Sequence, residues 1–394
     1  MTETAAQCSA LTTVDPNSQR TIWGEDAQQH WLELSSTAAR LNEFGATITS
    51  AAGVDFAMHE PNLFSSGPEA GYIGSETGLI PLQIDPPDHA RYRRMLDPLF
   101  SPRRMAALEQ SVVELANTCI DSFIDRGRCN FSDEFGNPFP IGIFLGLLGL
   151  PLSGMPEFIR MKDDMIRPAS DDLEIADQIR HRAAEEIMAL FSNALLARET
   201  EPKDDLLGHF VERERAGDLS REDSLNICLL LLLAGLDTVT GTLECAFALL
   251  ARRPDLQRML TEPAGIASAV EELLRWIVTS PTQSRIATSD TVVDGLAIKA
   301  GTLVKIVQAT WNFDPNRVEE PLTVDLTRRA NQHSSFGIGV HRCLGSHLAR
   351  LELRVALTEW HRRIPEYRLP DGYEVRYTQS LRGVTDLPIE FGHA

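Results

Sequence analysis

The sequence has few cysteines, and their arrangement does not suggest a disulfide-stapled fold. The six stand at positions 8, 119, 129, 228, 245 and 343, without a CxxC pair. This scatter argues against a disulfide framework and against a four-cysteine zinc site. Residues 1–20 also lack the basic start and the apolar segment of a signal peptide. We therefore expect a cytoplasmic protein.

Positive charge is scarce as well. The chain carries 37 Lys and Arg residues against 56 Asp and Glu residues, which gives a formal net charge of -19. An acidic surface repels phosphate backbones and anionic membranes. We therefore expect neither nucleic acid nor a membrane as a partner.

Long apolar runs and internal repeats are missing too. The run at 227–236 has about half of the ~20 apolar residues that a membrane-spanning helix needs, and it ends at Asp237. No repeat of roughly 20 to 50 residues and no Gly/Ser linker divides the chain. We predict a single domain over residues 1–394, with a poorly ordered segment at 1–20.

Most of the chain repeats apolar residues every three or four positions, as amphipathic helices do. The predicted helices include 105–125, 180–198, 221–252, 266–278 and 344–363. Strand patterns occur late, at 285–307 and 375–391, and the first contains two expected hairpin turns, Asp294-Gly295 and Ala300-Gly301. The fold class is therefore mainly α with a minor β region.

The helix at 221–252 has a predicted N-terminal cap at Ser220, with Asp223 three residues later. About 32 residues at roughly 1.5 Å each make it near 48 Å long, enough to cross the protein. Asp237 is then a puzzle, because a buried Asp needs a partner. Either Asp237 faces solvent, or Gly235 opens room for a bound group and the acid handles protons there. The helix alone does not decide between these.

The segment 334–357 surrounds Cys343 with glycines that permit tight turns, and a long helix is predicted directly after it. The positive end of that helix dipole, together with His341 and Arg342, is expected to favour a thiolate. Cys343 could instead be a small buried hydrophobe. A zinc site with His333 and His347 is a further alternative, but those spacings match no common zinc finger.

This segment resembles the cysteine loop of the cytochrome P450 family of haem-thiolate monooxygenases. The family pattern Phe-x-x-Gly-x-x-x-Cys-x-Gly, with a basic residue two before the cysteine, appears as Phe336, Gly339, His341, Cys343 and Gly345. The resemblance implies a cytochrome P450 fold, with haem b as cofactor and Cys343 as the proximal iron ligand. Such a thiolate pushes electron density toward bound dioxygen. Phe336 and Gly345 are implied to lie against the haem.

Other family features occur in the expected order. Glu272 and Arg275 match the Glu-x-x-Arg pair that braces the fold, although the same spacing recurs elsewhere and usually marks a solvated helix contact. The segment 85–100 resembles the helix at the haem edge. Its His89 and Arg93, with Arg285 and His341, are implied to bind the haem propionates.

The stretch 234–238, AGLDT, matches the oxygen-activation motif of the family. The resemblance implies that Asp237 and Thr238 lie over the distal face of the haem. Thr238 would hold the oxygen substrate and a water, and Asp237 would relay protons from solvent. This pair implies a cycle that uses dioxygen and electrons.

Within the family, the segment 127–151 is most similar to the camphor hydroxylase branch. Thr77 stands where that branch has a tyrosine for the camphor ketone, which argues against camphor. The implied substrate-binding residues are Thr77, Leu79, Leu82, Leu230, Leu233, Ala234, Pro281 and Leu381. These mostly apolar residues suit hydroxylation of a small terpenoid or ionone-like norisoprenoid, but each could equally be core packing.

Arginines gather in two places despite the overall acidity. They are Arg91, Arg93, Arg94, Arg103 and Arg104 in one region, and Arg328, Arg329, Arg342 and Arg350 around the cysteine loop. If both regions share a face, they form a dock for an acidic [2Fe-2S] ferredoxin, which an NAD(P)H-dependent reductase would supply with electrons. Solvated charge without a partner is the alternative. A haem-based sensor without turnover would need neither the dock nor the acid-threonine pair.

Overall fold

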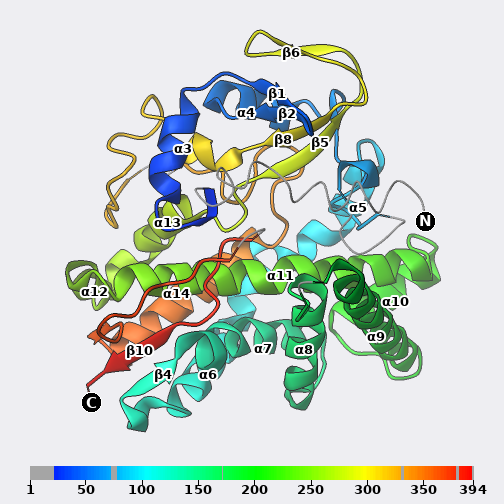
Figure 1. Ribbon diagram of the computed structural model, residues 1–394. Helices are drawn as coiled ribbons and strands as arrows, with labels where there is room; N and C mark the ends of the chain where they lie inside the picture. Colours follow the sequence, from blue (N-terminus) through cyan, green and yellow to red (C-terminus); the bar gives the residue numbers. More distant parts are fainter. Residues whose placement is uncertain (1–21, 72–77, 171, 330–331, 379–380, 393–394) are drawn as a thin grey trace.

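A computed structural model describes residues 22–71, 78–170, 172–329, 332–378 and 381–392 (Figure 1). The predicted segment 1–20 and Thr77 lie outside these residues. The helices are α3 Ala27–Ser35, α4 Ala51–His59, α5 Asp88–Leu96, α6 Pro102–Asp121, α7 Pro138–Leu147, α8 Met155–Ile166, α9 Leu173–Thr200, α10 Leu206–Ala216, α11 Arg221–Leu250, α12 Pro254–Leu260, α13 Ile266–Ile277 and α14 Ser346–Arg363. The fold is mainly helical, as predicted, and all five helices predicted above are present.

The strands are β1 Arg40–Asn42, β2 Gly45–Ile48, β3 Phe64–Ser65, β4 Arg128–Asn130, β5 Gln283–Ala287, β6 Thr291–Val293, β7 Leu296–Ile298, β8 Leu303–Ile306, β9 Tyr367–Arg368 and β10 Pro388–Phe391. The main sheet has the order β1-β2-β8-β5-β3, and a smaller sheet has the order β4-β10-β9. Together with the hairpin β6-β7, these strands make up the minor β region.

One predicted hairpin is present and the other is wrong. Asp294 and Gly295 join β6 to β7 with φ angles of 51° and 80°, as a two-residue hairpin turn requires. Ala300-Gly301 does form a turn, with Gly301 at φ 81°. However, β8 pairs with β2 and β5 and not with β7, so this turn carries the chain from one sheet to another.

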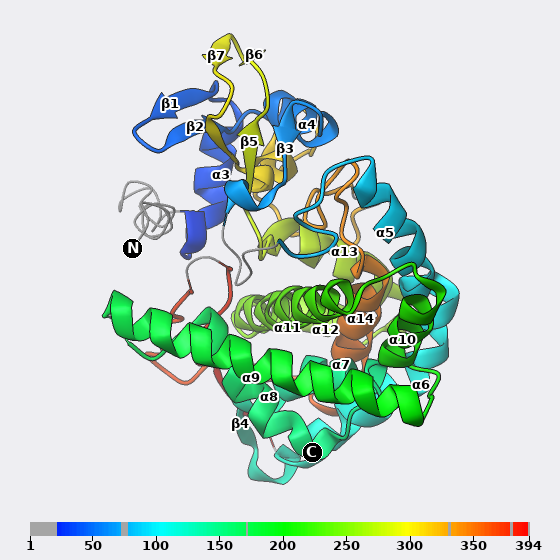
Figure 2. The same cartoon turned by 90° about the vertical axis from the view of Figure 1, so that its right-hand side faces the viewer.

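The central helix α11 is built as its sequence indicates. Ser220 and Asp223 form a reciprocal capping box at its start. Figure 1 shows the helix crossing the whole molecule, and Figure 2 shows it almost end-on, with the main sheet above and α8 and α9 below. Within the described part of the chain, α11 is the one helix long and apolar enough to span a membrane, but 67% of its apolar window is buried inside the protein.

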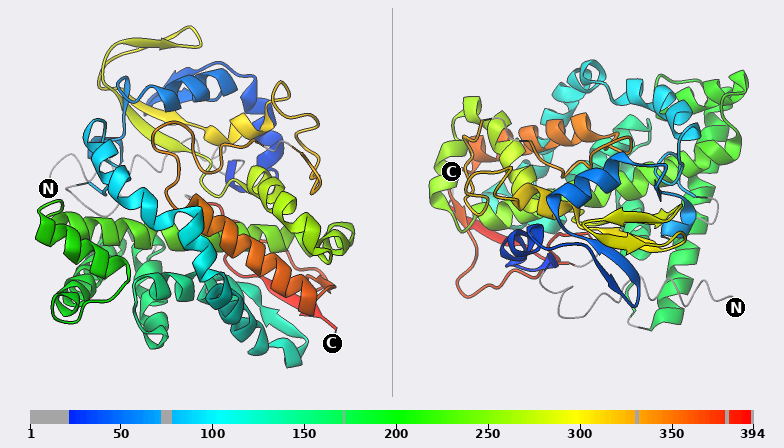
Figure 3. Two further views of the ribbon diagram at one scale, coloured as in Figure 1. Left: turned by 180° about the vertical axis from the view of Figure 1, so that it is seen from behind. Right: turned by 90° about the horizontal axis from the view of Figure 1, so that it is seen from above.

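Two large hydrophobic clusters meet at α11. The first joins α11 to α6, α13 and α14, with Trp360 packed against Phe131 and Phe247 at its centre. The second joins the N-terminal half of α11 to α7, α8, α9 and α10. Figure 3 shows α14 lying beside α11 when the molecule is seen from behind. The loop that precedes α14 contains Cys343, so the packing positions this loop next to the centre of the protein.

Candidate active site

The loop that carries Cys343 is held by its own backbone. Cys343 N–H donates to the Phe336 carbonyl at 2.7 Å. Gly339 has φ 73°, and a Cβ there would lie 2.1 Å from the Met58 carbonyl oxygen. Only glycine fits this close approach. α14 begins at Ser346 with Gly345 as its N-cap, so Cys343 stands just before a helix N-terminus, as predicted.

The predicted thiolate is not a property of the polypeptide alone. Burial raises the pKa of Cys343, and this outweighs the Gly345 N–H bond to sulfur and the nearby charges of Arg93, Arg342 and Arg350, which lower it. The expected effects of the helix N-terminus and the arginines are present, but the expectation left out the larger cost of desolvation. A metal cation at the sulfur would reverse this balance, since a coordinating thiol loses its proton.

The zinc alternative has no support in this structure. Among the described residues, no group of three or more His, Cys, Asp or Glu side chains is placed to hold a metal ion. His333 contacts Glu271 at 3.2 Å. A single cysteine ligand therefore fits the surroundings of Cys343 better than a multidentate protein site does.

The middle of α11 opens onto empty space. Ala234 and Gly235 are exposed although they lie in the middle of a helix that crosses the protein. A Cβ added to Gly235 would meet no atom within 4 Å. We call this space the hollow. Gly235 thus leaves room beside the helix for a bound group, as one of the two interpretations of the sequence required.

Asp237 faces away from the hollow and into the protein. It is 5% exposed, and its two carboxylate oxygens accept hydrogen bonds from Lys162 at 2.8 Å and from Arg167 at 2.6 Å. The solvent-facing alternative is therefore wrong. About 200° separates Asp237 from Gly235 around the helix, so its carboxylate points away from the hollow. The expected position over the haem stays a prediction.

Sequence reasoning missed both partners of Asp237. Lys162 is 0% exposed, and its Nζ also contacts Asn137 Oδ1 at 3.0 Å and Asp163 at 2.8 Å. The sequence did contain a clue that Lys162 is buried, because it lies on the apolar face of α8, next to Met161 and one turn after Phe158. A lysine on a buried face requires an acid, but the sequence does not say which one.

Thr238 lies on the side of α11 that is nearer to the hollow, since it follows Ala234 by one turn. It is partly exposed, and its hydroxyl donates to the Ala234 carbonyl at 2.8 Å. Its lone pairs therefore remain able to accept a hydrogen bond from a ligand or a water.

The four residues expected at the propionates form a cationic cluster. The rings of His89 and His341 lie 4.3 Å apart. Burial, followed by the charges of Arg285, His89 and Arg93, lowers the pKa of His341 to about 3. Burial also lowers the pKa of Arg285 to about 10, against the opposing effect of Asp85. A bound anion would raise the pKa of both His341 and Arg285, because it would stabilise their protonated forms.

Two details refine this cluster. Within the described part of the chain, the buried Nε2 atom of His341 has no hydrogen-bond partner. Arg93 is already engaged, because it donates to Asp97 at 2.7 Å and to the Arg342 carbonyl at 2.6 Å. Arg285, His89 and His341 are therefore freer than Arg93 to receive carboxylates.

These residues fit haem b. The hollow leaves room beside Gly235, Cys343 offers one sulfur ligand, and the cationic cluster lacks the negative charge that two propionates would bring. Each observation concerns a different part of the cofactor, so together they point to the same group.

Glu272 and Arg275 form a buried pair and not a solvated helix contact. Both are 0% exposed, and two bonds of 2.8 Å join them. Arg275 also donates to the carbonyls of Asn312, Pro321 and Thr323, which ties α13 to the chain ahead of the cysteine loop. Arg328 joins Glu272 at 3.1 Å.

The residues expected at the substrate have mixed surroundings. Ala234 is exposed to the hollow, and Leu82, Leu233 and Leu381 are partly exposed. Pro281 is buried, Leu230 is 8% exposed, and Leu79 is 0% exposed in the second hydrophobic cluster. Core packing accounts for these last three without a ligand.

The bond from Arg93 to the Arg342 carbonyl connects the two arginine regions at one point. Not all of their charge is available, however. Arg328 is bound to Glu272, and Arg350 is paired with Glu271 at 2.6 Å.

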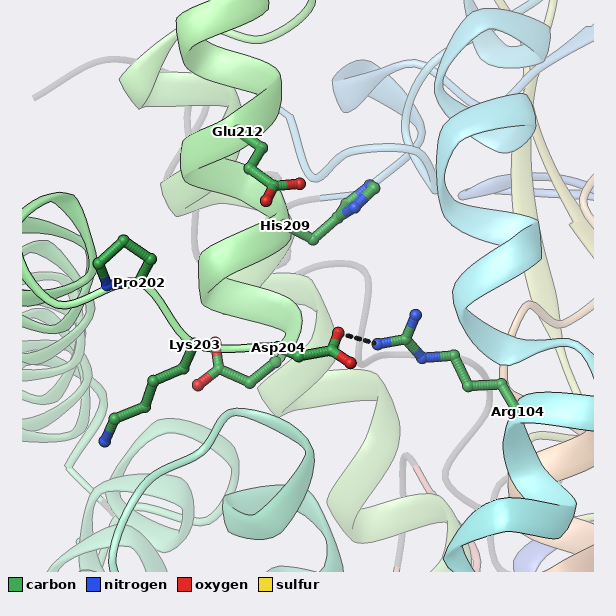
Figure 4. A pocket seen from close by; sticks show the side chains of 7 residues that line it. Arg104, Pro202, Lys203, Asp204, His209 and Glu212 are labelled. Atoms are coloured by element: carbon green, nitrogen blue, oxygen red, sulfur yellow. Dashed lines mark hydrogen bonds and ion pairs between the residues drawn. The ribbon is translucent and has the colours of Figure 1, made fainter.

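Arg104 is also paired. Figure 4 shows its bond to Asp204, which measures 3.2 Å, beside a pocket of about 350 Å³ that Glu212 also lines. Arg91, Arg94, Arg103, Arg329 and Arg342 are exposed.

Comparison with known proteins agrees with the site. The sequence profile of the family described as Cytochrome P450 matches residues 153–263 and 266–363. The chain is 36% identical over 330 residues to a protein named probable cytochrome P450 127A1 from Sinorhizobium fredii, covering 82% of this chain and 78% of that one. It is 31% identical to a steroid C26-monooxygenase of Mycobacterium tuberculosis, covering 93% of each chain.

A solved structure shows the same fold. The myxobacterial cytochrome P450 CYP267B1, determined in complex with myristic acid, superposes with a TM-score of 0.86 at 27% identity, over 96% of this chain and 98% of that one. The cysteine loop, the hollow and the cationic cluster thus occur on a known haem-binding architecture. On these grounds, the chain belongs to the cytochrome P450 family of haem b monooxygenases.

Proposed function

We propose that this protein hydroxylates a small apolar terpenoid or norisoprenoid, with dioxygen and two electrons from a [2Fe-2S] ferredoxin. The observation that carries the proposal is the pair Asp237 and Thr238 on the central helix: Thr238 lies near the hollow, and Lys162 and Arg167 hold Asp237 on the other side of the helix. A protein that only bound haem would not need a buried acid with two cationic partners beside that site.

The chain's own residues divide the work. Haem, when bound, supplies dioxygen activation at an iron that carries the Cys343 thiolate. The Thr238 hydroxyl donates to the Ala234 carbonyl, so its oxygen accepts a hydrogen bond from a water that carries the proton. When Asp237 separates from Lys162 or Arg167, its freed carboxylate oxygen would accept a proton from solvent and pass it toward Thr238.

The substrate is held mainly by apolar contact. Leu82, Leu233, Ala234 and Leu381 are the expected residues that retain exposure, and none of them offers a charge. Burial of a compact hydrocarbon there would yield about 25 cal/mol per Å². The steroid named for one relative and the myristic acid bound to another are also largely apolar.

The electron donor would dock beside the cysteine loop. Exposed arginines occur in both arginine regions, which the Arg93–Arg342 bond connects beside this loop, and an acidic ferredoxin would be steered toward them. A groove of about 290 Å³ between α6, α13 and α14 offers Met105, Val270 and Leu351 next to Arg350. Apolar contact there would supplement the charges. The described cysteines are all free, which suits the reducing cytoplasm that we propose as its location.

Reconstitution tests this proposal. The holoprotein is combined with a [2Fe-2S] ferredoxin, its reductase, NADPH and a panel of monoterpenes and ionones, first chosen by their ability to shift the haem from low to high spin. Alcohol formed in proportion to the NADPH consumed is the expected result. Consumption of NADPH without any alcohol, across every compound that gives the spin shift, would favour a haem-based sensor.

A further inference from the structure

A second buried acid lies on the same helix face as Asp237. Asp237, Thr240 and Glu244 follow one another at spacings of three and four, so they form one stripe along α11. Their exposed fractions are 5%, 2% and 2%. We call this stripe the polar seam. It faces the short turn at 132–136, where the Thr240 hydroxyl donates to the Gly136 carbonyl at 2.9 Å.

Glu244 has few partners for a buried acid. Its Oε2 accepts one hydrogen bond, from Val384 N–H at 2.9 Å. Burial raises the pKa of Glu244 to about 7, while Val384 N–H, the Ser132 hydroxyl and the charge of Arg167 lower it and Asp237 raises it. Both protonation states of Glu244 are therefore populated near neutral pH.

The cations near the polar seam differ in how firmly they are held. Lys162 is 0% exposed and has three oxygen partners, from Asn137, Asp163 and Asp237. Arg167 follows the end of α8, its side chain is 37% exposed, and it pairs with Asp237 at 2.6 Å. Arg167 is therefore the cation that can respond to a new charge in the polar seam.

The balance of charges in the polar seam predicts in which direction Arg167 would move. With Glu244 protonated, the positive charges of Lys162 and Arg167 match the negative charges of Asp163 and Asp237. When Glu244 ionises, a third acid faces the same two cations. Asp133, near Asp163, and Arg382, which lies behind Cys245, are the other charged groups at the ends of this region. The added charge would attract Arg167 toward Glu244.

We infer that Glu244 is a positioning residue for Asp237, which competes for Arg167 and so sets how readily Asp237 is released to move protons. The inference rests on the proposed role of Asp237 in proton delivery. Ionised Glu244 loosens the bond between Asp237 and Arg167, and protonated Glu244 leaves that bond intact. Coupled turnover should therefore rise as the pH passes through neutrality.

The first readout is spectroscopic and needs no turnover. In the holoprotein, infrared difference spectra between about pH 6 and about pH 8 should show the carbonyl band of a carboxylic acid that disappears with rising pH. Glu244→Gln should lack this band and still accept the Val384 N–H bond through its amide oxygen.

Arg167→Gln separates positioning from simple packing. Since the charge of Arg167 lowers the pKa of Glu244, its removal should move the midpoint of the Glu244 band to higher pH. A midpoint that stays where it is in Arg167→Gln would overturn the inference, and so would a Glu244→Gln protein that keeps the band.

The second readout is the pH profile of product formed per NADPH consumed. The wild-type protein should gain roughly threefold over this range, the ratio that corresponds to half a pKa unit of free energy. Glu244→Gln, checked for full haem content, should stay at the low-pH value throughout. An unaltered profile in Glu244→Gln overturns the inference. If the infrared titration succeeds but Thr238→Ala leaves coupling unchanged, the proposed function fails instead.

Discussion

Replacement of Lys162 by methionine tests the network that holds Asp237. Lys162 is fully buried, and its Nζ lies 2.8 Å from Asp237, 2.8 Å from Asp163 and 3.0 Å from Asn137. Removal of one partner from a buried pair costs about 3 to 5 kcal/mol. Because Arg167 still pairs with Asp237 in the variant, we expect the lower end, ~3 kcal/mol.

Thermal unfolding of the holoprotein measures this loss. For a chain of 394 residues, ~3 kcal/mol corresponds to a decrease in Tm of roughly 4 °C. Lys203→Met is the matched control, because Lys203 is exposed, and a surface change of this kind stays within about 0.5 kcal/mol.

The double variant Lys162→Met with Asp237→Asn decides whether the pair itself is responsible. Asn leaves no uncompensated charge in the protein, so the double variant should be more stable than the sum of the two single losses predicts. Strict additivity, or a Tm of Lys162→Met equal to that of the Lys203 control, would refute the reasoning that Lys162 stabilises Asp237.

Three further changes test the site. Thr238→Ala should keep haem and substrate binding but divert electrons into hydrogen peroxide, which an assay of peroxide against alcohol measures; coupling equal to wild type would contradict this. Cys343→Ala should lose the red-shifted carbon monoxide spectrum of a thiolate-ligated ferrous haem, and a variant that retained it would exclude Cys343 as the ligand. Since burial raises the pKa of Glu244 from 4.5 to about 7, the folded state binds the extra proton, and its contribution to stability should be lost as pH rises between these values. Urea unfolding of wild type and Glu244→Gln at several pH values should show their difference changing in this window alone.

Sequence reasoning succeeded where the signal is local. The capping box at Ser220 and the turns around Cys343 depend on residues within a few positions of each other, and both are present. The partners of Asp237 lie far away in the chain, at 162 and 167, and no spacing rule connects them. Ala300-Gly301 fails for the same reason, because a turn does not determine which sheet receives the next strand.

The protonation state of Cys343 depends on how deeply the thiol is buried, which the sequence does not reveal. A helix dipole and adjacent positive charges are visible in the sequence, and they act as expected, since Arg342 does lower the pKa of the thiol. The degree of burial is not visible, and here it has the larger effect. Burial also lowers the pKa of His341 to about 3, although the sequence led us to expect a positive charge there.

The two sides of α11 separate two requirements that would otherwise conflict. An apolar substrate needs a dry surface, which Leu233 and Ala234 provide beside the hollow, while proton delivery needs charged groups and access to solvent. Because Asp237 lies about 200° around the helix from Gly235, its ion pairs face α8 and reach the partly exposed Asp163 through Lys162. In the proposed mechanism, protons would therefore approach Thr238 from behind the helix without water filling the substrate side. Thr238, one residue beyond Asp237, is the point where the two sides meet.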